Sequence, residues 1–202
     1  VSAAFDGVDV VIHLAGANEV VARQEPELAL TETISAAYRA GHYAKEAGVS
    51  RVVFVSTVHV YGSAMVEDAV LTEDTLPSPR SIYATARLTS EHLLWATTSA
   101  STEMVVLRLT NSLGAPIDPS VDRWSLVAND LCRQAALTGQ LKLRSHGYQW
   151  RDFISLTDVC RVLEAGTLGS IAPGTYNLGS GEPMTIRGLA ELVQEAYESI
   201  TG

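Results

Sequence analysis

Two nearly continuous hydrophobic runs constrain the fold of this chain more than any other feature. They are residues 8–14 (VDVVIHL) and 51–55 (RVVFV). Such runs are typical of parallel strands that are covered on both faces. Residues 27–47, which lie between them, are rich in alanine, leucine and glutamate and stop before Gly48. This pattern predicts a helix closed by a C-terminal glycine, and therefore a right-handed strand-helix-strand unit.

The same alternation continues and then changes character. A helix is predicted over residues 81–98 and a third strand over 104–109, whereas the segment after Asn111 contains prolines and turn-forming residues. There we expect a helix over 122–137, short strands around 141–143 and at Phe153, a helix over 158–167 capped by Thr157, a strand over 176–178 and a helix over 186–200. We interpret 1–112 as a partial dinucleotide-binding Rossmann-like domain. Residues 113–202 are then mostly a smaller substrate-binding lobe, with segments that return to the first domain.

The fold class is accordingly α/β, a Rossmann-like doubly wound parallel sheet without its N-terminal strands and with a mixed α/β substrate lobe. Such a sheet normally begins with a strand, a GxGxxG turn and a helix. The glycine pair Gly179 and Gly181 comes late and has a different spacing. Because a hydrophobic edge strand is a liability, we expect residues before Val1 in the parent protein, or another chain, to cover residues 8–14.

Charge and composition exclude several classes of function. The chain has 14 basic and 23 acidic residues, with a net charge of −9, which argues against a nucleic-acid partner. No apolar run approaches the ~18 residues of a membrane helix. Cys132 and Cys160 are interpreted as reduced, buried thiols of a cytoplasmic protein, with a disulfide or a metal site as the alternative. The histidines have no metal-binding spacing, so no metal site is predicted.

Three segments contain the residues suited to chemistry. Residues 13–18 (HLAGAN) and 55–62 (VSTVHVYG) follow predicted strands, where open α/β sheets bind ligands. Residues 81–91 (SIYATARLTSE) begin a predicted helix. Tyr83 and Arg87 are four residues apart and therefore lie on one face of that helix.

With these segments the chain resembles the extended short-chain dehydrogenase/reductase family, and within it the nucleotide-sugar epimerases and dehydratases. The resemblance covers nearly the whole chain, and six or more weak motifs occur in the family's order. They are HLAG, the ST-x-x-VYG segment, Glu73 with Pro77, YxxxK with Arg87 at the lysine position, Arg108 with Asn111 and Gly114, RDF-I-x-x-x-D from Arg151 to Asp158, and YN-x-G-x-G from Tyr176 to Gly181.

The resemblance implies that Tyr83 is a catalytic base and that Thr57 holds the substrate oxygen. A phenol in water ionises only near pH ~10, so a tyrosine base needs a nearby cation that favours the phenolate. Arg87 stands at the position where the family has this lysine, and the chain has only two lysines, Lys45 and Lys142. Arginine keeps the charge but is larger and planar. The alternative is that Arg87 is a helix-surface cation and the site is degraded; residues 31–35 also lack the asparagine usual in the family.

The resemblance further implies NAD or NADP as cofactor, with NAD favoured, and a nucleotide-diphosphate sugar as substrate. For Arg151 an ion pair with Asp152 or Asp158 is the alternative to diphosphate binding, and for Asn111 it is a loop-capping role. The expected cofactor contacts are Leu14, Ala15, Gly16, Val55, Ser56, Tyr83 and Arg87, and the expected substrate contacts are Thr57, His59, Asn111 and Arg151.

Residues 58 and 59 separate the reactions of the family. Its dehydrating members have Asp-Glu after the threonine, whereas this chain has Val58 and His59. The resemblance therefore implies an epimerase or 4-keto reductase that acts at one sugar carbon, in a homodimer, with His59 as an alternative base. Two other hypotheses are a catalytically silent member that binds a dinucleotide or sugar nucleotide as a sensor or assembly partner, and a reductase of a non-sugar ketone.

Overall fold

The computed structural model describes residues 2–66, 69–118, 120–121 and 123–202. The chain divides into two compact units. The first comprises Val1–Leu109 and Cys160–Leu178, and the second Thr110–Val159 and Gly179–Gly202. The first stretch of the first unit ends at Leu109. The next strand, β4 (Asn111–Leu113), belongs to the second unit and pairs with β6 (Phe153–Ser155). Each unit is described below by itself.

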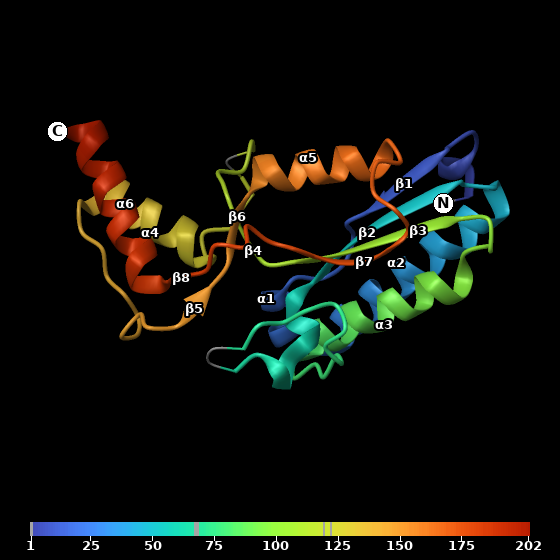
Figure 1. Ribbon diagram of the computed structural model, residues 1–202, viewed down its shortest axis with the longest axis horizontal. Coiled ribbons are helices and arrows are strands. Elements are labelled where there is room, and N and C mark those ends of the chain that lie inside the picture. Colours follow the sequence, from blue (N-terminus) through green and yellow to red (C-terminus); the bar gives the residue numbers. More distant parts are fainter. Residues whose placement is uncertain (1, 67–68, 119, 122) are drawn as a thin grey trace. The chain divides into compact units, whose positions relative to one another are not determined.

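The first unit is built on a four-stranded parallel sheet in the order β1-β2-β3-β7 (Figure 1). Its strands are β1 (Val10–His13), β2 (Arg51–Thr57), β3 (Glu103–Leu109) and β7 (Gly174–Leu178). The expected α/β class with a Rossmann-like parallel sheet is confirmed. β1 is shorter than predicted and half exposed, with Ile12 42% exposed, because it forms one edge of the sheet and pairs only with β2.

Two helices cover one face of the sheet. α2 (Pro26–Ala47) ends at Gly48, whose φ of 71° confirms the predicted glycine cap. α3 (Ile82–Thr97) begins after Ser81, whose hydroxyl accepts a hydrogen bond from the Ala84 amide. The two helices approach so closely that a Cβ on Gly41 would overlap the Thr97 hydroxyl. The core between the helices and the sheet consists of Ala37, Ala40, Ala44, Val49, Val52, Phe54, Leu94, Met104 and Val106.

The opposite face of the sheet is covered by α5 (Leu156–Thr167), where Gly166 lies against Val53 (Figure 1). Strand residues 52 and 54 face α2 and α3, so Val53 between them faces the other way. The predicted cap of α5 was wrong. The helix begins at Leu156, and the hydroxyl of Ser155, not that of Thr157, accepts the hydrogen bond from the Asp158 amide.

The second unit contains α4 (Val127–Thr138) and α6 (Ile186–Thr201), which pack around Leu131, Phe153 and Leu189. It also contains the β4–β6 pair and an antiparallel pair of β5 (Trp150–Arg151) with β8 (Met184–Thr185). The strand predicted at 141–143 is absent; Leu141 and Leu143 instead pack as single side chains against the α4–α6 cluster. Residue 122, where α4 was expected to begin, lies outside the described residues.

Both cysteines lie on helices, as predicted, but the expectation that they are buried was wrong. Cys132 on α4 and Cys160 on α5 are exposed free thiols. The apolar residues around them in the sequence form the buried faces of these helices, and the two thiols lie elsewhere on the helix surface. None of the helices in the described part of the chain has the length and apolar character needed to span a membrane.

Candidate functional site

The candidate site lies at the carboxyl ends of β1 and β2. After β1 the chain turns through Leu14, Ala15 and Gly16 into the short helix α1 (Glu19–Gln24), which Asn18 caps. Gly16 has a φ of 144°, a conformation that side-chain-bearing residues rarely adopt. The amide of Ala17 donates to the buried hydroxyl of Thr33 on α2, 3.0 Å away. The turn is therefore fixed to the helix beneath it.

The side chain of Arg87, which lies on α3, packs against this turn. Its side chain is buried, and Nη1 donates to the carbonyl oxygens of Ala15 (3.3 Å) and Val55 (3.4 Å). A Cβ on Gly16 would lie 3.1 Å from Cζ and Nη2 of the guanidinium. Arg87 is only 8% exposed, which excludes the alternative that it is a helix-surface cation. The guanidinium instead bridges the ends of two strands and occupies the space beside the glycine.

The buried ring of His13 lies near Arg87. His13 stacks on Phe54 with ring centroids 5.3 Å apart, and the Arg87 Cζ lies 5.9 Å from the same Phe54 ring. Burial, and then the charge of Arg87, lowers the pKa of His13 to about 4. His13 is therefore neutral at pH 7, and its ring serves in packing.

Thr57, His59 and Tyr83 lie in a connected group next to Arg87. Thr57 ends β2 and is 4% exposed, and its hydroxyl accepts a hydrogen bond from the His59 amide at 3.2 Å. This bond begins the 3-10 segment η2 (Val58–Ala64). The rings of His59 and Tyr83 meet edge to face with centroids 6.3 Å apart, and the Tyr83 ring centroid lies 5.7 Å from the Arg87 Cζ. The structure thus places the predicted base beside the predicted cation and connects the Thr57 hydroxyl to this pair through His59.

The expected cofactor contacts divide into two kinds. Leu14 is 55% exposed and, with Ala15, Gly16 and Val55, lies at the strand ends beside Arg87. Ser56 is buried, and its hydroxyl donates to Glu91, so that this side chain belongs to the interior of the first unit.

In the second unit, the predicted phosphate ligands Asn111 and Arg151 both donate hydrogen bonds to backbone carbonyls. The Asn111 side-chain amide donates to the Asp152 carbonyl at 3.0 Å. Arg151 is exposed and donates to the Trp150 carbonyl at 2.7 Å. The Asp152 carboxylate accepts instead from the Thr110 hydroxyl and from the amides of residues 180 and 181.

Sequence reasoning missed Thr33, Glu91 and Asp152. Glu91 was recognisable in principle, because it lies eight residues after Tyr83 and therefore on the same helix face. Thr33 lies within the segment that lacked the expected asparagine, and its hydroxyl provides a hydrogen-bond acceptor for the turn. Asp152 was named only as a possible ion-pair partner of Arg151, and no sequence signal indicated that its carboxylate binds the amides of residues 180 and 181.

A parallel sheet covered on both faces, with polar side chains gathered where its strands end, defines the Rossmann-like class of α/β proteins. A sequence model of the NAD dependent epimerase/dehydratase family matches residues 1–179, and the chain belongs to this family. The family lies within the extended short-chain dehydrogenases/reductases, as the sequence motifs indicated.

Individual relatives agree with this assignment. The chain is 33% identical over 152 residues to a dTDP-6-deoxy-L-talose 4-dehydrogenase (NAD(P)(+)) from Kitasatospora kifunensis, an alignment of 74% of this chain and 47% of that enzyme. An NAD-dependent NDP-hexosamine 5,6-dehydratase of tunicamycin biosynthesis superposes with a TM-score of 0.82 and 27% identity, over 96% of this chain and 63% of the other. The UDP-glucose 4-epimerase of Thermus thermophilus, solved with NAD, gives 0.78 and 27%, over 95% and 62%. The chain thus spans about half the length of the first of these relatives.

Proposed function

We propose that this chain belongs to an NAD(P)-dependent epimerase or 4-keto reductase that moves hydride at one carbon of a nucleotide-diphosphate sugar. The observation that supports it most directly is the group of Thr57, Tyr83 and Arg87 at the end of β2. Family membership and the names of the relatives supply the substrate class.

Each residue has a role in this proposal. Tyr83 takes the proton from the sugar hydroxyl, and the Thr57 hydroxyl holds the same oxygen. Arg87 is a buried cation whose Cζ lies 5.7 Å from the centroid of the Tyr83 ring, which places a positive charge beside the proposed base. His59 is exposed, its ring lies edge to face with that of Tyr83, and it is a candidate substrate contact.

The residues at the strand ends suit a dinucleotide. Leu14 offers an exposed apolar side chain, and the Arg87 Nε is buried without a hydrogen-bond partner among the described residues. We therefore assign Leu14, Ala15, Gly16, Val55 and Arg87 to the cofactor. When bound, NAD(P) supplies the hydride acceptor or donor.

Positions 58 and 59 support redox chemistry at a single carbon. They hold valine and histidine, and therefore lack the two carboxyl groups that would serve as additional acid and base in an elimination of water. Asn111 and Arg151 are assigned to the substrate diphosphate, to which a guanidinium donates in bidentate fashion.

The test is turnover of UDP-, dTDP- and GDP-hexoses by the protein, expressed with whatever flanking sequence its gene encodes, with products resolved by chromatography. We expect Tyr83→Phe to lower kcat by about 10²–10⁴-fold while sugar-nucleotide binding, read as a rise in Tm, stays unchanged. Tyr38→Phe, on the exposed side of α2, is the matched control and retains full activity. If the wild type converts none of these sugars, or Tyr83→Phe retains full kcat, the proposal is wrong.

One observation favours the catalytically silent alternative: an arginine fills the position of the family lysine and is packed tightly against backbone carbonyls. Arg87→Lys separates the two hypotheses. A large gain in turnover identifies a damaged site, and a loss shows that the arginine is used. If no sugar nucleotide raises the Tm of the protein, the hypothesis of a reductase acting on a non-sugar ketone is favoured. The homodimer and the cytoplasmic location stay predictions.

A further inference from the structure

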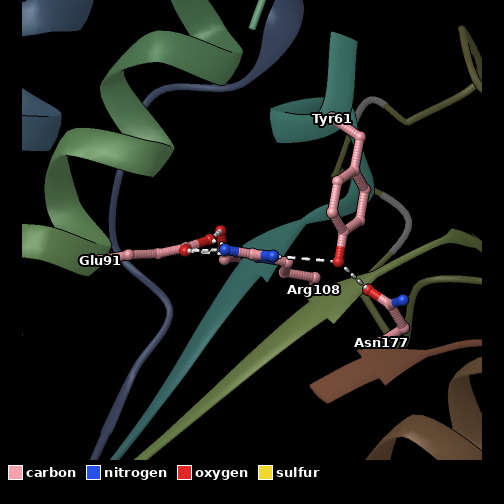
Figure 2. A network of polar contacts seen from close by, with 5 residues as sticks. Tyr61, Glu91, Arg108 and Asn177 are labelled. Carbon is pink, nitrogen blue, oxygen red and sulfur yellow. Dashed lines mark hydrogen bonds and ion pairs between the residues drawn. The ribbon is translucent and has the colours of Figure 1, made fainter. Parts of the chain in front are cut away.

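A buried polar network joins α3 and η2 to one row of residues on the main sheet. Ser56 of β2 is the register partner of Arg108 of β3, which in turn is the partner of Asn177 of β7. Ser56 and Arg108 both contact Glu91 of α3, and Figure 2 shows Arg108 linked to Asn177 through the Tyr61 hydroxyl. Because register partners are fixed by the backbone ladder, this row is a rigid reference within the unit.

Glu91 of α3 contacts two members of this row at once. Its carboxylate accepts a hydrogen bond from the Ser56 hydroxyl, and it accepts from Nη2 of Arg108 at 2.8 Å and from Nε at 3.3 Å. Figure 2 shows the carboxylate and the guanidinium facing each other. Glu91 is 3% exposed. The carboxylate makes a bidentate ion pair with Arg108 and also accepts a hydrogen bond from Ser56, so its orientation is fixed.

The same Arg108 also holds η2. Its Nη1 donates to the Tyr61 hydroxyl at 2.9 Å, and that hydroxyl donates to the Asn177 side chain at 2.7 Å (Figure 2). Burial opposes the charge of Arg108, but the hydrogen bonds with Glu91 and Tyr61 outweigh it and raise its pKa. Arg108 therefore stays charged and connects the two segments that carry the candidate catalytic groups.

The positions of these anchors relative to the site are specific. Tyr83, Arg87 and Glu91 follow one another at intervals of four on α3, so all three lie on the face toward the sheet. At a rise of about 1.5 Å per residue, Glu91 lies about 12 Å along the helix from Tyr83. Ser56, which Glu91 binds, is the residue before Thr57.

We propose that Glu91 is a positioning residue, which sets Tyr83 on α3 against Thr57 at the end of β2 by anchoring the helix to Ser56 and Arg108. The inference rests on the proposed function, since the geometry it controls is that of the base and the hydroxyl. Glu91 is buried behind the site and acts through the helix. Its effect therefore falls on the rate of the chemical step, because a misplacement of about 1 Å can cost ~10²-fold in rate.

The experiment compares Glu91→Gln, Ser56→Ala and the double variant in the same protein used for turnover. Glu91→Gln removes the charge at nearly constant size, whereas Ser56→Ala leaves the ion pair intact, so one variant remains informative if the other unfolds. We expect kcat to fall at least 10-fold for Glu91→Gln and about 3-fold or more for Ser56→Ala, with KM for the sugar nucleotide within 2-fold of wild type. The double variant should resemble Glu91→Gln alone, because both changes break one connection.

The control is an ion pair at the other end of the same strands. Arg51 and Glu103 begin β2 and β3 and pair with each other, with Glu103 half exposed. Glu103→Gln should leave kcat within 2-fold. Far-UV circular dichroism and Tm establish which variants are folded.

The outcomes separate this inference from the proposed function. One outcome refutes the positioning role alone. If the wild type is active and the folded Glu91 and Ser56 variants have the same kcat as Glu103→Gln, or lose activity only because KM rises, Glu91 does not position the base. The proposed function then stands. If the wild type converts no sugar nucleotide, the proposed function fails and the inference falls with it.

Discussion

Replacement of Gly16 by alanine tests how closely the turn after β1 is matched to Arg87. The new Cβ would lie 3.0 Å from the Thr33 Cγ2 and 3.1 Å from the Arg87 Cζ and Nη2. Each of these distances is tighter than an ordinary van der Waals contact. The φ of 144° adds a conformational cost that glycine does not have.

The structure sets the size of the effect. A side-chain-bearing residue in a sparsely populated backbone conformation costs about 1–3 kcal/mol, and overpacking of a buried site costs about 1–3 kcal/mol. We therefore expect Gly16→Ala to lower the free energy of unfolding by about 2–6 kcal/mol. Gly48→Ala is the control, because Gly48 has a φ of 71° and no atom within 4 Å of the added Cβ. It should show the conformational cost without the packing cost.

A double-mutant cycle identifies the partner. Arg87→Lys removes the Cζ and Nη2 atoms but leaves the Thr33 contact. In that background Gly16→Ala should cost about 1 kcal/mol less than in the wild type, a coupling typical of residues in contact. The assay is urea unfolding followed by circular dichroism and analysed by linear extrapolation. The same cost in both backgrounds, to within about 0.5 kcal/mol, would refute the matched packing of the glycine and the arginine.

Two further predictions concern stability alone. Because the pKa of His13 falls from 6.5 to about 4 on folding, the unfolded chain binds more protons between these values, so that stability is full above pH 6.5 and declines toward pH 4. The decline approaches about 3 kcal/mol and should be smaller in His13→Leu; parallel pH profiles of the two proteins would contradict it. In the second unit, Asp152→Ala leaves two loop amides, of residues 180 and 181, without their acceptor and should cost about 1–3 kcal/mol in urea unfolding. Asp118→Ala, which removes one exposed acceptor, should change stability far less, and equal losses would show that the loop amides do not depend on Asp152.

The elements that the sequence predicted well have signals that act locally. The helix before Gly48 ends there because the chain needs a left-handed residue, and glycine provides it at no steric cost. The apolar runs at β2 and β3 became strands because both faces of the inner sheet are covered. The prediction of a strand at 141–143 failed for the opposite reason. Its alternating leucines pack against helices, and the Lys142 amide donates to the Gln134 side chain rather than to a neighbouring strand.

The candidate site was predicted in part for the same physical reason. Tyr83 and Arg87 share a helix face by spacing alone, so that their proximity followed from the sequence. The bond between Ser56 and Glu91 could not be predicted, because it depends on the register of β2 with β3 and on where α3 crosses them. The role of Gly16 was hidden as well, since it depends on the conformation of a side chain 71 positions later.

The contacts of Arg87 differ from those that a lysine could make at the same position. A lysine has a single nitrogen at its end, whereas Nη1 of Arg87 contacts the carbonyls of Ala15 and Val55 while Cζ and Nη2 lie against Gly16. An arginine at this position therefore links β1, β2 and α3, and it does so without a neighbouring carboxylate in contact with its guanidinium among the described residues. Burial, and after it the charge of Arg87, lowers the pKa of His13. A neutral residue at position 87 should therefore raise the pKa of His13 and, because Arg87 lies beside the ring of the proposed base Tyr83, it should also lower kcat.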